Sequence, residues 1–270
     1  MLGEVLGTAS TAIDELEADG LPQHQIPNVS VTWAPEIAGR RYQTLLVSAH
    51  QFSSALFSLF TNGTATSLAR FSLVGPRSVE VATLTQLTDS IALLATTLSL
   101  NEPQFGVQIA QGLFESGPVS FERVIILDFI TSFQLYPSST PPPSEAPYLW
   151  HLKTGVYQEI PELPVPFLPL PVTVNGLGAA ILTKCEILRC PGAIYFSLLP
   201  DGVLTAEALF AFEPILRAAG VWEHALVAAD KQLHTHTPSA DRPVTSSPLY
   251  SLYKATIGLA RKLGGNIIYV

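Results

Sequence analysis

The chain has 270 residues, of which 47% are apolar and only 13% are charged, and its formal net charge is −8. This length suits one large α/β domain or two small ones, with ample hydrophobic core. The acidic balance and the lack of a basic cluster in the sequence exclude nucleic acid and anionic membrane as expected partners. The sequence contains no run of 18 apolar residues, so no membrane span is predicted. So few charges also indicate a surface with large protein interfaces.

The first 28 residues are polar and turn-rich, and we expect them to form an N-terminal arm. The segment 1–19 has no basic stretch and carries five acidic residues, Glu4, Asp14, Glu15, Glu17 and Asp19. A secretory leader would need a basic start, so none is expected, and the predicted location is the cytoplasm, with the nucleus as a second compartment.

The segments that follow the arm read as strands and helices in alternation. Apolar alternation, buried runs and helical periodicity predict strands at Asn28–Trp33, Tyr42–Ser48, Leu68–Val74, Ser78–Leu84 and Ile91–Thr97, with helices at Gln51–Phe60 and from Asn101 to Phe114. Arg123–Phe129, with four consecutive apolar residues, is typical of a central parallel strand buried on both faces.

The second half continues the pattern after two Pro-rich passages, near 137–147 and 159–172, that are expected to be irregular. Helices are predicted over Gly176–Arg189, Thr205–Ala219, Val221–Leu233 and Leu249–Leu263, and a strand over Ala193–Leu199. This alternation of strands and helices predicts a single three-layer α/β domain over 29–263, with a mostly parallel sheet flanked by helices. Residues 264–270 are expected to form a flexible tail.

Few residues suggest catalysis. Asp128 ends the most apolar strand, at a position where α/β enzymes often keep a catalytic acid, although a lone acid there is as often a cap for the next turn. Asn175-Gly-Leu-Gly178 opens a helix but lacks the third glycine of a dinucleotide fingerprint. Gly176 and Gly178 are therefore expected to permit close packing at the helix start.

The candidate metal and thiol residues are equally sparse. His234 and His236 lie in a Thr/Pro/Ser-rich loop and are interpreted as solvated rather than metal-binding. Cys185 and Cys190 match neither a redox nor a zinc spacing and are interpreted as buried thiols. Ser251-Leu-Tyr-Lys254 matches a Ser-x-x-Lys pattern without a companion motif. No catalytic residue, metal or cofactor is predicted.

The last three residues, Ile268-Tyr269-Val270, follow a double glycine, Gly264-Gly265. An apolar anchor, a Tyr hydroxyl and a terminal carboxylate together make a plug for a pocket on another protein. Such an ending arises by chance in roughly one chain in seventy. The segment Asn266–Val270 is also readable as a last β-strand on the domain.

Several internal stretches carry a more specific resemblance. The internal stretches are Leu45–Phe60, Gly178–Leu199 (GAAILTKCEILRCPGAIYFSLL) and Leu204–Leu216 (LTAEALFAFEPIL). The N-terminal Met1–Val5 and the terminal Asn266–Val270 add to them. In these stretches the chain resembles the proteasome assembly chaperone 1 family, with the better fit in its second half. Residues 61–90 and 137–171 lie outside the resemblance.

The resemblance implies a nucleoside-phosphorylase-like fold without its active site. It implies a heterodimer with proteasome assembly chaperone 2 that acts on the α-subunit ring of the forming 20S proteasome. Ile268, Tyr269 and Val270 would then enter a pocket between adjacent α subunits, with Gly264 and Gly265 as the hinge.

Three hypotheses remain open at the level of sequence. The first is a non-enzymatic chaperone that favours α-ring formation and blocks premature activator binding. The second is a small-molecule enzyme of phosphorylase- or hydrolase-like fold, favoured by Asp128 and the glycines near Gly176. The third is an activator or adaptor that uses the same tail on the mature particle.

Overall fold

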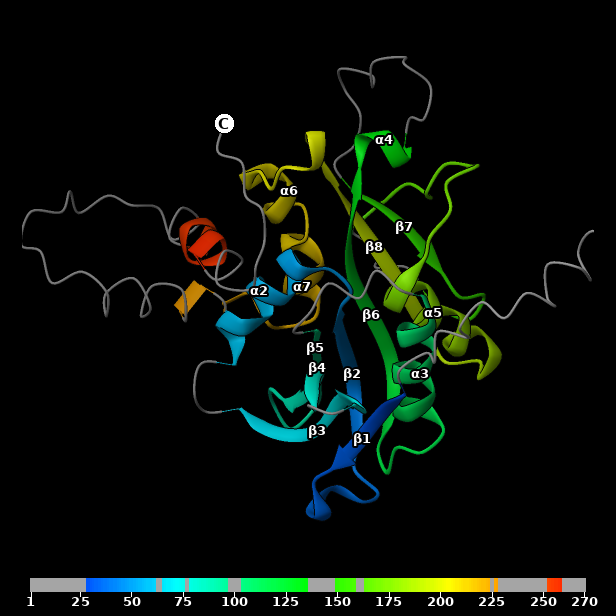
Figure 1. Ribbon diagram of the computed structural model, residues 1–270. Coiled ribbons are helices and arrows are strands. Elements are labelled where there is room, and N and C mark those ends of the chain that lie inside the picture. The colour runs from blue at the N-terminus through cyan, green and yellow to red at the C-terminus, as the bar shows by residue number, and fades with distance from the viewer. Residues whose placement is uncertain are drawn as a thin grey trace, which may run out of the picture.

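The computed structural model describes residues 28–61, 65–75, 78–96, 103–135, 149–158, 163–223, 226–227 and 252–258. Its centre is an eight-stranded sheet in the order β1-β3-β4-β5-β2-β6-β8-β7 (Figure 1). The strands are β1 (Val29–Trp33), β2 (Arg41–Ser48), β3 (Thr66–Leu73), β4 (Val79–Gln86), β5 (Ile91–Thr96), β6 (Ser120–Thr131), β7 (Leu149–Lys153) and β8 (Gly192–Leu199). The strands predicted from sequence are all present, and β7 is an addition to them.

The sheet is parallel only in its middle, so the prediction of a mostly parallel sheet is wrong in that respect. Strands β5, β2, β6 and β8 pair in parallel, whereas β1, β3, β4 and β5 pair antiparallel on one side and β7 pairs antiparallel with β8 on the other. The connection between β4 and β5, residues 87–90, is a tight turn. Parallel neighbours need a crossover of about a dozen residues or more, so this turn dictates an antiparallel pair.

Helices cover both faces of the sheet, which confirms the predicted three-layer α/β domain. On one face lie α2 (Gln51–Phe60), α6 (Ala206–Phe210), α7 (Glu213–Ala218) and the helical residues 252–258. On the other lie α3 (Pro103–Phe114) and α5 (Gly176–Ile187). Alternate residues of β2 enter opposite cores: Leu46 packs with α2, while Leu45 and Val47 pack with α3 and α5.

The helix predicted from Thr205 to Ala219 is two helices. Thr205 does cap the first, since its side chain accepts a hydrogen bond from the N–H of Ala208. The chain then turns at Ala211–Phe212, and Pro214 stands in the first turn of α7. Proline has no N–H to continue the helical ladder, and its ring collides with the carbonyl four residues back, so one continuous helix is interrupted here.

The described part of the second Pro-rich passage, residues 163–172, runs irregularly beside the edge strand β7, as predicted. It meets the sheet at a single bridge, where His151 donates its N–H to the carbonyl of Pro166 and accepts from the N–H of Leu168. The passage thereby covers backbone groups of an edge strand that would otherwise be open to another chain. The first Pro-rich passage, 137–147, lies outside the described residues.

The N-terminal arm and the tail also lie outside the described residues, so the boundaries at 28 and 264 stay predictions. The short elements η1 (Pro35–Ile37), α4 (Ser132–Leu135) and η2 (Pro200–Gly202) complete the described chain. Within those residues, no helix is long and apolar enough to cross a membrane.

Candidate functional site at the carboxyl ends of the central strands

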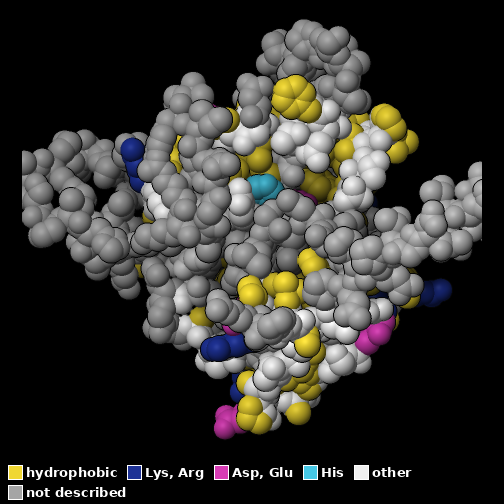
Figure 2. Space-filling view, viewed as in Figure 1, with side chains coloured by type: hydrophobic (Ala, Val, Ile, Leu, Met, Phe, Trp, Pro, Cys, Tyr) yellow, Lys and Arg dark blue, Asp and Glu magenta, His cyan; other side chains and the backbone are white. Residues whose placement is uncertain are grey.

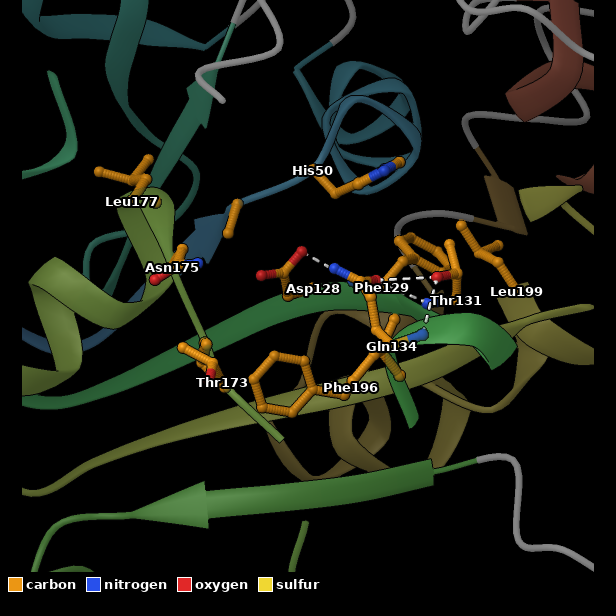
Figure 3. Close-up of a pocket in the computed structure, with 14 residues that line it drawn as sticks. His50, Asp128, Phe129, Thr131, Gln134, Thr173, Asn175, Leu177, Phe196 and Leu199 are labelled. Atoms are coloured by element: carbon orange, nitrogen blue, oxygen red, sulfur yellow. Dashed lines mark hydrogen bonds between the residues drawn. The ribbon is translucent and has the colours of Figure 1, made fainter. Parts of the chain in front are cut away.

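A cavity of about 350 Å³ lies at the carboxyl ends of β2, β6 and β8 (Figure 3). Strand β2 is joined to its neighbour β5 through α2, which covers one face of the sheet, and through β3 and β4. From β5 the chain crosses β2 by way of α3, on the other face, to reach β6 on the opposite side of β2. Neighbouring strands whose connections diverge in this way leave a crevice between their ends. In α/β proteins ligands bind at this topological switch point.

The cavity exists because β6 is longer than its neighbour β2. The last residue of β2, Ser48, pairs with Leu127, but β6 continues beside β8 as far as Thr131. The backbone of β2 turns away at Ala49, whose N–H still donates to the carbonyl of Leu127. Residues 128–131 are therefore without a strand on that side, and all four line the cavity.

Asp128 is the acidic side chain at the floor of the cavity (Figure 3). Its Oδ1 accepts a hydrogen bond of 2.8 Å from the N–H of Phe129. Burial raises the pKa of this carboxyl group to about 7, although the hydrogen bond from Phe129 acts in the opposite direction. Strand β6 does not end at Asp128, so this residue is a wall of the cavity rather than a cap of the strand.

His50 contributes the imidazole of the site from the start of α2. Its Nδ1 accepts from the N–H of Phe52 at 3.2 Å and so caps the helix, and its ring packs against the rings of Phe52 and Phe129. Burial lowers the pKa of His50 to about 4. Figure 3 shows the imidazole nitrogens turned away from the Asp128 carboxylate. The two residues therefore do not form an acid–base pair.

The start of α5 makes the opposite wall, and here the glycines predicted for close packing are confirmed in that role. A Cβ at Gly178 would lie 2.5 Å from Cδ1 of Ile194 and 3.4 Å from Oδ2 of Asp128. Gly176 has a φ of +79°, a conformation that side chains other than glycine rarely adopt. The side chain of Asn175 makes no capping bond to the helix and lines the cavity instead.

The remaining lining combines apolar walls with neutral polar side chains. No Lys or Arg is among the described residues that line it. The apolar walls include Leu177, Phe196 and Leu199, and the polar groups are those of Thr131, Gln134, Thr173 and Asn175. Figure 2 shows this end of the molecule hollowed between hydrophobic side chains, with a histidine inside the hollow. Cavities of this size and composition suit a small ligand held by a few polar contacts.

Cys185 and Cys190 are closer than their spacing in the sequence suggests. Helix α5 ends in a Schellman turn: Arg189 has a φ of 52°, and Cys190 donates its N–H to the carbonyl of Cys185 at 2.8 Å. This turn brings the residues at its two ends together, and the thiol of Cys190 donates to the carbonyl of Phe121 at 3.7 Å. The interpretation of Cys185 as a buried thiol is confirmed, whereas Cys190 is half-buried.

The other residues singled out from the sequence lie outside the described residues. They are Gly264, Gly265, Ile268, Tyr269 and Val270 of the tail, the pair His234 and His236, and Ser251. Across the described ranges, no group of three or more His, Cys, Asp or Glu side chains is placed to hold a metal ion.

The low charge content predicts apolar surface, and the described part of the chain has it. Phe133 of α4 is 73% exposed, and Leu170, beside the β7 edge, is 93% exposed. Phe167 and Val156, in the same edge region, are also exposed. Exposed large apolar side chains that gather in one region are typical of protein interaction sites.

Comparison with solved structures defines the class of fold. The chain superposes on PbaA of Pyrococcus furiosus, described as an archaeal homolog of proteasome-assembly chaperone, with a TM-score of 0.52. The alignment covers 87% of this chain and 96% of PbaA at 12% sequence identity. At that identity the likeness establishes the fold alone, and it agrees with the predicted α/β class.

Comparison with curated proteins gives a more particular likeness. The chain is 34% identical over 86 residues to proteasome assembly chaperone 1 of Xenopus laevis, and 36% identical over 70 residues to that of Xenopus tropicalis. These matches span 32% and 26% of this chain, but only 29% and 24% of the relatives' lengths. No family model matches the chain. The predicted resemblance to proteasome assembly chaperone 1 is thus confirmed over this part of the sequence.

Proposed function

We propose that this protein is a chaperone of proteasome assembly. The observation that carries the proposal is the identity of 34% over 86 residues with a protein named for that role, on a chain whose fold follows PbaA over 87% of its length. The exposed Phe133 and Leu170 and the low charge content support a function that depends on protein contacts.

In this proposal the chain pairs with proteasome assembly chaperone 2 and binds the outer face of the α-subunit ring. Its tail, Ile268-Tyr269-Val270, enters a pocket between two α subunits, while Gly264 and Gly265 let the tail reach it. The terminal carboxylate would meet a lysine there, and the Tyr side chain adds apolar area and a hydroxyl donor. The bound chaperone favours ring formation and blocks activators that use the same pockets, in the cytoplasm and the nucleus.

The proposed role includes no catalysis. The described cavity contains one acid, Asp128, and one imidazole that is turned away from it. A general acid–base mechanism needs such groups within hydrogen-bonding reach of a shared substrate atom. The arrangement of His50 and Asp128 supports binding over chemistry.

The test is purification of the full-length tagged chain from its own cells, followed by identification of the bound proteins. We expect a second assembly chaperone and 20S α subunits, with mature particles carrying active β subunits depleted. Capture of mature 20S particles at equal or greater yield would favour an activator or adaptor. Purification without any proteasome subunit would contradict the proposal.

A further inference from the structure

Asp128 places a carboxyl group in a cavity that no described Lys or Arg lines, and the proposed chaperone role does not explain it. Its carboxyl group lies half-buried at the bottom of the cavity, where Oδ1 accepts a hydrogen bond from the backbone N–H of Phe129. A carboxylate partly withdrawn from water without a cationic partner is costly, so such a group either takes up a proton or pairs with a positive charge. No described Lys or Arg lines the cavity to supply the positive charge.

The cavity also has a volume and a lining that a ligand would use. Its volume of about 350 Å³ lies within the range of small-molecule sites. Leu177 and Phe196 offer apolar walls next to the carboxylate, and Asn175 and Thr173 offer neutral polar groups at the rim. Polar and apolar groups thus line the same cavity (Figure 3).

We infer that the cavity binds an organic cation, that is, an ammonium or amidinium group carried on an apolar body. The cation pairs with Asp128, and the body packs against Leu177 and Phe196. A free amine and the basic side chain of a partner protein share this chemistry. Charge-assisted hydrogen bonds of this kind are about twice as strong as neutral ones, and exclusion of water strengthens them further.

An anion is the main rival ligand, because the first residues of α5 line the same cavity and helix N-termini attract anions. Asp128 works against that alternative. A Cβ at Gly178 would lie only 3.4 Å from Oδ2, so the carboxylate already occupies the space beside the start of the helix. An anion placed there would meet the negative charge of Asp128 at close range.

The charged state of the site depends on pH through Asp128. Its pKa is raised to about 7, so the carboxylate that would bind a cation forms mainly above neutrality. His50 is the other titratable group that lines the cavity, and with a pKa near 4 it stays neutral between pH 6 and 8. The described wall formed by α5 and residues 173–175 carries no charged side chain at the cavity.

The experiment is calorimetric titration of the full chain with benzylamine at pH 6 and pH 8, since its ammonium group is charged at both. We expect binding at pH 8 that is about tenfold weaker at pH 6, because the ionised fraction of Asp128 falls by about that factor. Benzyl alcohol, which has nearly the same shape and no charge, should bind at least about tenfold more weakly than benzylamine at pH 8. Equal binding of the two would overturn the proposal.

Two variants test the site itself. Asp128→Asn keeps the acceptor for the N–H of Phe129 and should abolish the pH dependence. Thr173→Arg adds a positive charge at the exposed rim and should weaken benzylamine binding, while Thr32→Arg, on the exposed side of β1 at the far edge of the sheet, should not. Benzylamine binding unchanged by both Asp128→Asn and Thr173→Arg would contradict the assignment.

Two further ligands separate the alternatives. N-acetylarginine methylamide represents a basic side chain from a partner protein, and tighter binding than that of benzylamine would indicate that source. Weaker binding would indicate a free amine. Inorganic phosphate should not bind at either pH, and phosphate binding that strengthens at pH 6 would show an anion site and overturn the proposal.

Discussion

Gly106 of α3 and Gly176 of α5 bring the backbones of their two helices into direct contact. A Cβ at Gly106 would lie 2.9 Å from the carbonyl carbon and oxygen of Gly176. Because backbone atoms cannot move aside as a side chain can, Gly106→Ala should destabilise the domain by about 1–3 kcal/mol. Chemical denaturation measures this.

Gly258 provides the matched control for that substitution. It lies in the helical residues 252–258, and a Cβ there would meet no atom within 4 Å. Gly258→Ala should leave stability unchanged or raise it by up to about 1 kcal/mol, because alanine favours the helix. Equal losses from the two variants would contradict the close contact of α3 and α5.

Asp128 should make the protein less stable as the pH rises. Its pKa is raised to about 7 in the folded state, against about 4 in an unfolded chain. The folded state therefore holds the extra proton between these values, and the free energy of unfolding falls from pH 4 to pH 7. Asp128→Asn removes this fall and should be more stable than the wild type by about 1–3 kcal/mol at pH 8, with no difference below pH 4. Parallel pH profiles of the two proteins would contradict the raised pKa.

His50 should have the opposite dependence. Its folded pKa of about 4 lies below the value near 6.5 of an unfolded chain, so the unfolded state binds more protons and stability falls as the pH drops from 6.5 to 4. His50→Asn keeps a side chain that can cap α2. The difference in free energy of unfolding between the variant and the wild type should shift in favour of the variant by about 1–2 kcal/mol when the pH is lowered from 7.5 to 4.5. Denaturation at the two pH values measures it, and an unchanged difference would refute the lowered pKa.

The elements were predictable because their signals are local. The helix Gln51–Phe60 has the predicted bounds, and Thr205 is the predicted cap. Pro214 was visible in the sequence, and its effect on the helix was missed. The antiparallel edges depended on which strands become neighbours, although the tight turn at 87–90 was a usable signal.

The cavity was only partly predictable. Asp128 and the glycines Gly176 and Gly178 were singled out, but His50 was not, because 78 positions separate it from Asp128 and only the pairing of β2 with β6 brings them together. The contact of Cys185 with Cys190 was also missed. The usable signal was Pro191, which marks a helix end just before it; a Schellman turn at such an end brings together the residue before the proline and the residue five positions earlier.

The two cysteines should differ in reactivity. The neighbouring Cys185 side chain lowers the pKa of half-buried Cys190, while the Cys190 side chain, together with burial, raises the pKa of Cys185. Because the thiolate is the reactive form, iodoacetamide at pH 7.5 should modify Cys190 first, by at least about tenfold. Mass spectrometry of the peptides measures the order. Cys185→Ser should slow the reaction of Cys190 only a few-fold, and faster labelling of Cys185 in the wild type would contradict the arrangement.

The most direct test of the proposed chaperone role is the binding of reconstituted α-subunit rings by the chaperone pair, with and without the tail. Deletion of Ile268–Val270, or Tyr269→Ala, should weaken binding at least about tenfold, a loss of roughly 1.4 kcal/mol or more. Asn266→Ala, upstream of the three residues, should bind as the wild type does. Binding undiminished by both tail variants would contradict the role assigned to Ile268, Tyr269 and Val270, and no binding by the intact pair would contradict the account as a whole.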